Sequence, residues 1–305
     1  MTSTPDLTNP IRRDPDYQTR LEAAVTDQVI ASFGHARTDR LRTVMASLVS
    51  HLHAFAREIR LTEDEWDLAI RYLTDTGQIC TDTRQEFILL SDVLGLSMLT
   101  VGINSPAIPG ATESTVFGPF FVENSPEFAL GESIADGVSG LPCYVSGRVL
   151  GASGGPVPGA RLEIWEADAD GFYDVQYDET KRQARGHLFA DDQGAYRFWS
   201  VLPAPYPIPA DGPVGRLLDA ARRSPMRPAH IHFMVTAPGY GRLITHIFVG
   251  GGPHLSDDAV FAVKQSLITD FVRHPAGSVG PDGSHRDTDW YQAEFDIVLA
   301  PDQRS

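Results

Sequence analysis

Two histidines at alternate positions, His230 and His232, lie in the segment AHIHFMVTA. In a β-strand, residues i and i+2 share one face with Cα atoms about 6.6 Å apart, so both imidazoles can reach one metal ion. The intervening Ile231 and the following Phe233 point to the opposite face, which suits a core. The spacing alone leaves a metal site and a polar strand face equally open.

A second pair, His51 and His53, lies in the segment TDRLRTVMASLVSHLHAFARE, whose apolar residues follow the helical period. In a helix, positions i and i+2 are about 200° apart, so these two rings point away from each other. We therefore interpret His51 and His53 as surface or boundary histidines.

Tyrosines precede the second histidine pair in two turn-rich segments, Tyr173 and Tyr177 in DADGFYDVQYDE and Tyr206 in LPAPYPIPADGP. A phenol with a pKa near 10 is a poor ligand for Zn²⁺ or Fe(II), whereas a trivalent ion such as Fe(III) favours phenolate oxygen. Taken singly, each tyrosine also fits a half-buried aromatic residue with a hydrogen-bonded hydroxyl.

The elements that position these residues change in type near residue 105. Residues 20–104 have the helical apolar period, with a capping box at Thr62 and Glu65 and an apolar helix at 85–99. Beyond 106, short alternating runs between Gly- and Pro-rich turns indicate strands, with one helix at about 257–274. We predict an α+β fold: an N-terminal helical domain (1–105) followed by an antiparallel β-sandwich domain (106–305).

Composition narrows the class of protein. The 305 residues carry a formal charge of −15, which disfavours nucleic acid as a partner. No apolar run is long enough for a membrane span, and the first thirty residues have no signal-type apolar core. Only two cysteines, Cys80 and Cys143, are present. We therefore expect a cytoplasmic protein without a membrane or nucleic-acid partner.

The combination of Tyr173, Tyr206 and the run Arg-Pro-Ala-His-Ile-His at 227–232 resembles the intradiol ring-cleaving dioxygenases, as do FGPF at 117–120 and APGY at 237–240. The resemblance implies a non-haem Fe(III) enzyme of aromatic catabolism that acts on an aromatic diol or triol with O2. It implies Tyr173, Tyr206, His230 and His232 as metal ligands, and Tyr206 and Arg227 as catalytic residues. It also implies a homodimer formed through the helical domains, with phospholipid bound there.

Within that family, the pocket residues are similar to those of members that cleave hydroxyquinol (benzene-1,2,4-triol) to 3-hydroxy-cis,cis-muconate, which tautomerises to maleylacetate. Asp92, on an otherwise apolar helix, would accept a hydrogen bond from the third hydroxyl, which catechol lacks. His246 departs from the glutamine of catechol-type members, and a buried structural histidine is an equal alternative. The residues expected to line the pocket are Leu89, Asp92, Val116, Phe117, Gly118, Pro119, Phe120, Ile208, Pro209, His246 and Val260.

Three alternatives stay open at this point. The first is a catechol or chlorocatechol 1,2-dioxygenase on the same scaffold, which would give cis,cis-muconates. The second is a metal-free β-sandwich binding module, and the third is a zinc hydrolase that uses His230 and His232. Of these three alternatives, only the first, which uses two tyrosines and two histidines, would show the visible colour of phenolate bound to Fe(III).

Overall fold

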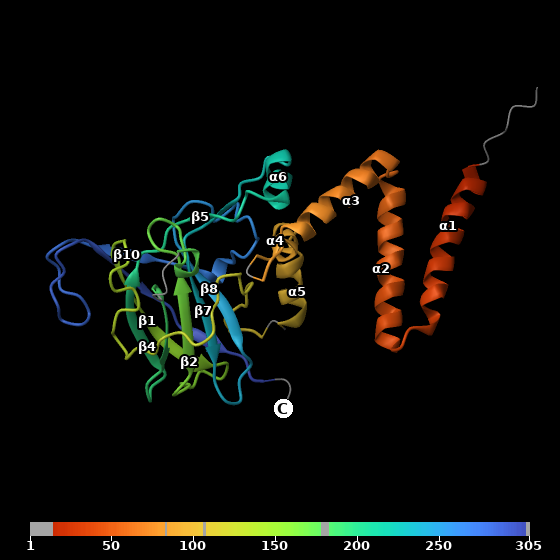
Figure 1. Cartoon of the computed structure of the whole chain (residues 1–305). Helices are drawn as coiled ribbons and strands as arrows, with labels where there is room; N and C mark the ends of the chain where they lie inside the picture. Colours follow the sequence, from red (N-terminus) through yellow and green to blue (C-terminus); the bar gives the residue numbers. More distant parts are fainter. Residues whose placement is uncertain (1–14, 83, 106–107, 178–182, 303–305) are drawn as a thin grey trace, which may run out of the picture. The chain divides into compact units, whose positions relative to one another are not determined.

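The computed structural model describes residues 15–82, 84–105, 108–177 and 183–302. The chain divides into two compact units between Leu73 and Thr74 (Figure 1). The second unit contains the last helices before the strands as well as all of the strands. The boundary expected after residue 105 stays a prediction about domain organisation.

The first unit is helical. It contains α1 (Pro15–Ser32), the 3-10 turn η1 (Phe33–His35), α2 (Asp39–Glu58) and the start of α3 (Glu63–Gln78). The capping box is confirmed, because Thr62 Oγ1 accepts from the Glu65 N–H and Glu65 Oε2 accepts from the Thr62 N–H. His51 is exposed, and His53 Nδ1 instead contacts Thr26 Oγ1 of α1 at 3.0 Å.

The apolar helix expected at 85–99 is two helices, α4 (Glu86–Val93) and α5 (Leu96–Asn104). Gly95 has a φ of 74°, which ends the α-helical path, and the two axes differ by 79°. Within the described residues, no single helix is long and apolar enough to cross a membrane, and only this bent pair meets that criterion when its helices are combined.

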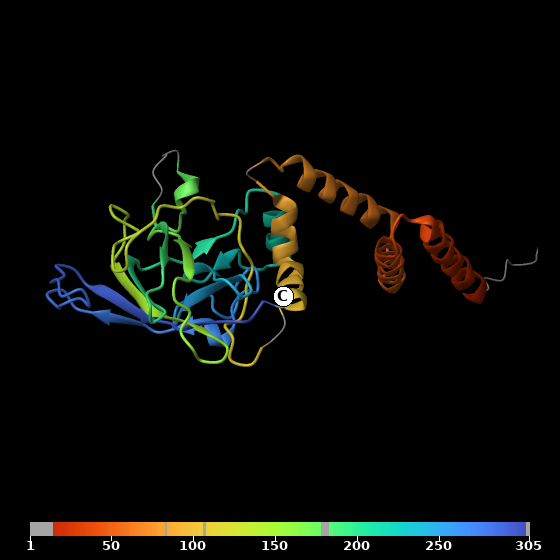
Figure 2. The ribbon, with the colours of Figure 1, turned by 90° about the horizontal axis from the view of Figure 1, so that it is seen from below.

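Two five-stranded sheets pack against each other in the second unit, with the small two-stranded ladder β5–β6 beside them (Figures 1 and 2). In the first sheet β4 pairs with β1, and the remaining order is β10-β11-β1-β12. The second sheet has the order β3-β2-β7-β8-β9. The strands are β1 (Pro142–Gly151), β2 (Arg161–Glu166), β3 (Arg185–Phe189), β4 (Ala195–Val201), β5 (Tyr206–Pro207), β6 (Met226–Arg227), β7 (His230–Thr236), β8 (Leu243–Val249), β9 (Ile268–Thr269), β10 (Phe271–His274), β11 (Trp290–Glu294) and β12 (Ile297–Leu299).

The main core fills the space between the two sheets. It includes Val145 and Phe198 from the first sheet, and Leu162, Ile164 and Phe233 from the second. A second cluster joins α4 to the short helix α6 (Pro213–Ala220), to Phe248 of β8 and to the loop at Val260. Figure 2 shows α4 and α5 beside the strands. This second cluster packs α4 against β8.

The predicted α+β fold, helical first and rich in sheet afterwards, is confirmed, but the strands are not all antiparallel as expected, because both sheets are mixed. β1 runs parallel to β11 and β12, and β8 runs parallel to β9. Each parallel pair joins segments separated by a long connection, which parallel pairing requires. Alternating hydrophobicity predicts that a strand exists, but it carries no information on the direction of the partner strand.

The helix expected at about 257–274 is also absent. The Asp258 carboxylate accepts hydrogen bonds from the N–H groups of Val260 and Ala262, and Phe261 has a φ of 59°. Such local bonding competes with a helix. The segment continues as the 3-10 turn η3 (Gln265–Leu267) and then as β9 and β10.

A buried acid, Glu166, ends β2 close to Tyr173. Its side chain accepts a hydrogen bond from the Ser200 hydroxyl and is almost fully buried. Burial raises the pKa of Glu166 to about 8, although the Ser200 bond opposes the shift. The folded protein therefore holds this group protonated at neutral pH, whereas the unfolded chain ionises it near 4.5.

We expect Glu166→Gln to raise the free energy of unfolding at pH 7 by about 2 kcal/mol, because glutamine stays neutral in both states. The wild-type contribution is complete below pH 4.5 and is lost as the pH rises to about 8. Urea unfolding of both proteins at pH 5 and pH 8 measures this difference. A difference between the two proteins that does not grow with pH would contradict a protonated Glu166.

Candidate active site

Four side chains from three separate segments converge on one point. The Tyr173 hydroxyl lies 3.2 Å from the Tyr206 hydroxyl, 3.4 Å from His230 Nε2 and 2.9 Å from His232 Nε2. The two histidine Nε2 atoms are 3.2 Å apart. All four residues are buried, with exposed fractions of 5% or less. The fold therefore brings together the four side chains that the family resemblance implies as metal ligands. We call these four side chains the donor set.

Local structure explains each position. In β7, Ile231 and Phe233 enter the core, so His230 and His232 share the other face. The β5–β6 ladder pairs Tyr206 with Arg227, which places the two side chains side by side. Tyr173 precedes the 3-10 turn η2 (Asp174–Gln176), and its N–H donates to Gln176 Oε1.

The protonation of the histidines suits a cation. His230 Nδ1 lies 2.7 Å from the Pro228 carbonyl, so Nδ1 carries the proton and the Nε2 lone pair faces His232. Burial lowers the pKa of both rings far below 6.5 and keeps them neutral. Donors about 2 Å from a shared metal ion lie about 3 Å from one another, as these four do. The two oxygens and two nitrogens therefore fit a metal ion that accepts phenolate and imidazole.

Arg227 supplies a fixed positive charge beside the four donors. Its Nη1 lies 3.4 Å from the Tyr206 hydroxyl and 3.2 Å from His230 Nε2. Its Nε donates to Asp258 at 3.2 Å, and both side chains of this pair are buried. Although burial alone would lower the pKa of Arg227, attraction to Tyr206 and Asp258 raises it, so the guanidinium stays charged. Sequence reasoning missed Asp258 because it placed this residue in a helix.

The expected pocket residues fall into two groups. Leu89, Val116, Ile208 and Val260 pack in the cluster that joins α4 to β8. Asp92 is 7% exposed and interacts electrostatically with Arg227. Burial raises the pKa of Asp92, while a hydrogen bond from Ser97 and the charge of Arg227 lower it. The carboxylate is thus a desolvated acceptor near the charged end of the site.

The second group is the FGPF segment, which lies against the donors. Phe120 stacks on Tyr173 with ring centroids 4.4 Å apart. Gly118 has a φ of 76°, and a Cβ there would lie 3.1 Å from the His232 ring, so glycine is required at this close approach. Phe117 packs on Trp165, which stacks on His232. The side chains of Pro119 and Pro209 are exposed instead.

His246 of β8 is a third buried histidine beside the donors. Its ring centroid is 4.1 Å from that of His232, and its Nδ1 contacts Thr115 Oγ1 at 2.6 Å. Ring nitrogens of His230, His232 and His246 all lie within 4.8 Å of one another. Among the described residues, His246 Nε2 has no hydrogen-bond partner. The structure thus places His246 against the donor set.

Comparison with known proteins fits this geometry. The family model "Catechol dioxygenase N terminus" matches residues 38–112, and the model "Dioxygenase" matches residues 116–301. A hydroxyquinol 1,2-dioxygenase of Rhodococcus opacus is 57% identical over 290 residues, which cover 94% of this chain and 97% of that protein. The chain belongs to the intradiol ring-cleaving dioxygenases.

Two further members of the family are less similar to the chain. The solved structure of hydroxyquinol 1,2-dioxygenase from Pseudomonas putida DLL-E4 superposes with a TM-score of 0.88 at 44% identity, covering 93% of this chain and all of that one. A catechol 1,2-dioxygenase of Candida albicans is 36% identical, with 92% of this chain and 93% of that protein covered. Membership in the family favours a dioxygenase over a binding module or a zinc hydrolase.

Proposed function

We propose that this intradiol dioxygenase cleaves hydroxyquinol with O2 to 3-hydroxy-cis,cis-muconate, the tautomer of maleylacetate. Both atoms of O2 enter the product, so no reductant is consumed. The observation that carries the proposal is the convergence of Tyr173, Tyr206, His230 and His232 beside a charged Arg227. The relatives named for hydroxyquinol are also more similar to the chain than the one named for catechol.

Those four side chains would hold Fe(III), since they offer two phenol oxygens and two neutral imidazoles. When bound, Fe(III) would supply the Lewis acidity that makes the doubly deprotonated diol reactive toward O2. The same set would suit Zn²⁺ poorly, because zinc sites use Cys, His and carboxylate ligands rather than tyrosine.

The protein's own residues then perform three tasks. As a phenolate, the Tyr206 side chain is placed to take a proton from a substrate hydroxyl, and Arg227 beside it stabilises the negative charge left on the substrate oxygen. Phe120 covers one face of the Tyr173 ring. Asp92 accepts a hydrogen bond from the third hydroxyl of the substrate. Asp92 thus orients the substrate ring as a hydrogen-bond acceptor, and Arg227 orients it as a positive charge.

Catechol or chlorocatechol cleavage is the second candidate, favoured by the same four side chains and by the relative named for catechol. Asp92 weighs against it, since a buried acceptor without its hydroxyl partner penalises catechol. The chain's chemistry at the diol carbons would be the same for either substrate.

A visible spectrum followed by an oxygen-uptake assay tests the proposal. The iron-loaded protein should be red from phenolate-to-Fe(III) charge transfer, and it should consume O2 far faster with hydroxyquinol than with catechol. A control without protein is needed because the triol autoxidises. A red protein that prefers catechol would support the second candidate, and a colourless, inactive one after iron loading would contradict both.

A homodimer formed through the helical unit, with phospholipid at the interface, is part of the proposal. Helix α2 and its C-cap residue carry an apolar stripe at heptad-like spacing, which is exposed in the part of the chain that the structure describes. Each stripe residue is at least 40% exposed: Leu41, Val44, Leu48, Leu52, Phe55 and Ile59. Such a stripe suits a second copy of the chain or acyl chains. The cytoplasmic location also stays a prediction.

Leu48→Glu is expected to convert the dimer to monomer, because it places a charge in the middle of this stripe. Light scattering after gel filtration gives the mass of each form. Ser50→Glu, on the same helix but outside the stripe, is the matched control. A Leu48→Glu protein of unchanged mass would remove α2 from the interface.

A further inference from the structure

A buried ion pair lies directly beside the Tyr173 segment. Arg185 and Asp174 have side-chain exposures of 2% each. Arg185 Nε donates to Asp174 Oδ2 at 3.0 Å, and Nη2 donates to Oδ1 at 2.6 Å. Asp174 follows Tyr173 in the chain, so the guanidinium fixes the backbone immediately after one of the four donors.

The same guanidinium also holds the wall of the site. Arg185 Nη2 donates to the Phe120 carbonyl at 2.7 Å, and the Phe120 ring stacks on Tyr173. One planar group therefore restrains both the segment that carries Tyr173 and the segment that covers it. A lysine has no such fork of donors, so this geometry requires arginine.

Strand register places Arg185 in line with the histidines. Across β3, β2 and β7, Arg185 is paired with Trp165, and Trp165 is paired with His232. Trp165 stacks on His232 with centroids 4.6 Å apart and planes 16° apart. Arg185, Trp165 and His232 thus occupy adjacent register positions on three neighbouring strands.

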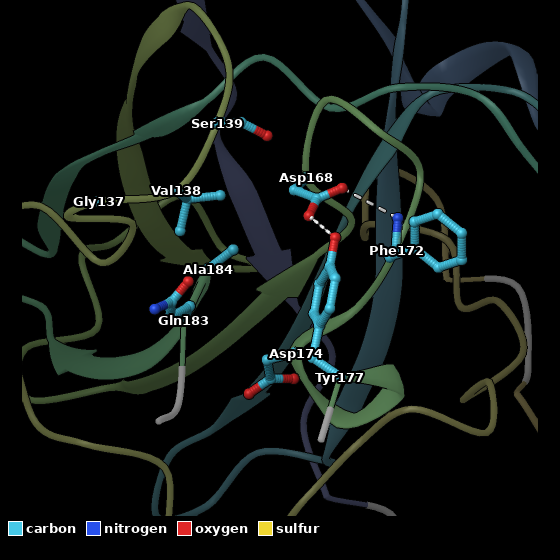
Figure 3. Close-up of a pocket in the computed structure, with 9 residues that line it drawn as sticks. All are labelled: Gly137, Val138, Ser139, Asp168, Phe172, Asp174, Tyr177, Gln183 and Ala184. Atoms are coloured by element: carbon cyan, nitrogen blue, oxygen red, sulfur yellow. Dashed lines mark hydrogen bonds between the residues drawn. The ribbon is translucent and has the colours of Figure 1, made fainter. Parts of the chain in front are cut away.

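Among the described residues, a cavity lies on the outer side of the Tyr173 segment. The cavity has a volume of about 240 Å³ and is lined in part by Asp168, Phe172, Asp174 and Tyr177 (Figure 3). Asp168 accepts hydrogen bonds from the Phe172 N–H at 3.0 Å and from the Tyr177 hydroxyl at 2.6 Å. Hydrogen bonds at Asp168 and the ion pair at Asp174 therefore anchor the segment on either side of Tyr173.

We propose that Arg185 and Asp174 are positioning residues of the intradiol site, holding Tyr173 and Phe120 in the arrangement that metal binding and turnover need. This inference rests on the proposed function. Stability alone does not account for the pair, since a buried ion pair is often no more stabilising than apolar side chains of similar size. Outer partners that orient metal ligands typically contribute about ten- to a hundredfold to metal affinity.

Three variants test the inference: Arg185→Lys, Asp174→Asn and the apolar double variant Arg185→Met with Asp174→Leu. The double variant removes both charges together and so avoids an unpaired buried ion. We measure Fe(III) affinity of the metal-free protein by chelator competition, the position of the charge-transfer band, kcat and KM, and the melting temperature. Each variant is expected to bind Fe(III) at least about tenfold more weakly, with a shifted band and lower kcat.

Asp289→Asn is the matched control. It breaks an ion pair with Arg273, in which Nε and Nη2 contact one carboxylate oxygen at the exposed edge of the other sheet. We expect wild-type Fe(III) affinity, band and kcat for this variant. A similar loss in the control would show that the measurements report general destabilisation and would overturn the inference.

Two results on the test variants would also overturn it. One is a folded Arg185→Lys or double variant with wild-type Fe(III) affinity and band. The other is failure of all three to fold, which would assign the pair to stability. If the wild-type protein binds Fe(III) but does not cleave hydroxyquinol, the proposed function fails, and the affinity and band still decide the role of Arg185.

Discussion

Tyr206→Phe is expected to retain Fe(III) and to lose about a thousandfold of kcat with hydroxyquinol. Three other donors, Tyr173, His230 and His232, remain to hold the metal. The lost oxygen lies 3.2 Å from the Tyr173 hydroxyl and 3.4 Å from Arg227 Nη1. As a phenolate it can take a substrate proton there, which leaves the negative charge on the substrate beside the guanidinium. Phenylalanine keeps the ring packing but accepts no proton.

Single-turnover kinetics and the visible spectrum measure this variant. Tyr240→Phe, which removes a hydroxyl in the turn between β7 and β8, is the control and should keep wild-type kcat. Wild-type turnover in Tyr206→Phe would remove its role as proton acceptor. Loss of iron would instead show that Tyr206 is required to retain the metal, so the proton-transfer assignment would not hold as stated.

The family motifs implied all four members of the donor set, whereas local spacing predicted only that His230 and His232 share a face. His230 and His232 occupy alternate positions of a strand, and period-two geometry dictates their shared face wherever that strand packs. The prolines around Tyr206 predicted a turn, and the structure adds the short ladder that pairs Tyr206 with Arg227. Local pattern and fold therefore agree for the histidine pair, whereas the Tyr173 hydroxyl meets His232 across a sequence separation of 59 residues.

The residues that contact and position the donor set were not predictable from sequence spacing. Asp258 lies in a segment with helical apolar spacing, but its carboxylate bonds to nearby N–H groups and to Arg227, 31 residues earlier. Arg185 and Trp165 reach the site only through the register of three strands. Propensity and periodicity describe one segment at a time, whereas these contacts depend on how segments pair.

Helix boundaries show the same limit. The apolar run at 85–99 has no proline, so helical periodicity alone extends it as one element. Gly95 breaks it with a φ of 74°, a backbone conformation that favours glycine. The break allows α4 to carry Leu89 and Asp92 toward the second cluster while α5 turns away by 79°. The left-handed backbone at one residue therefore decides which part of this run approaches the site.

Asp92→Ala is expected to reduce the preference for hydroxyquinol over catechol, expressed as the ratio of kcat/KM values, by about a hundredfold. With Asp92 present, catechol leaves a desolvated acceptor without its hydroxyl partner, while hydroxyquinol satisfies it. Alanine removes the acceptor, so the triol loses a hydrogen bond and catechol loses a penalty. The ratio consequently falls, because kcat/KM decreases for hydroxyquinol and increases for catechol.

Oxygen uptake at several concentrations of each substrate gives the two kcat/KM values. Asp219→Ala, an exposed carboxylate on α6, controls for the change in net charge and should leave the ratio unchanged. Asp92→Asn separates charge from hydrogen bonding: its amide oxygen still accepts, so it should retain more of the preference than alanine. An unchanged ratio in Asp92→Ala would make Asp92 a structural residue, and substrate choice would then have to come from the shape of the apolar wall formed by Leu89, Ile208 and Val260.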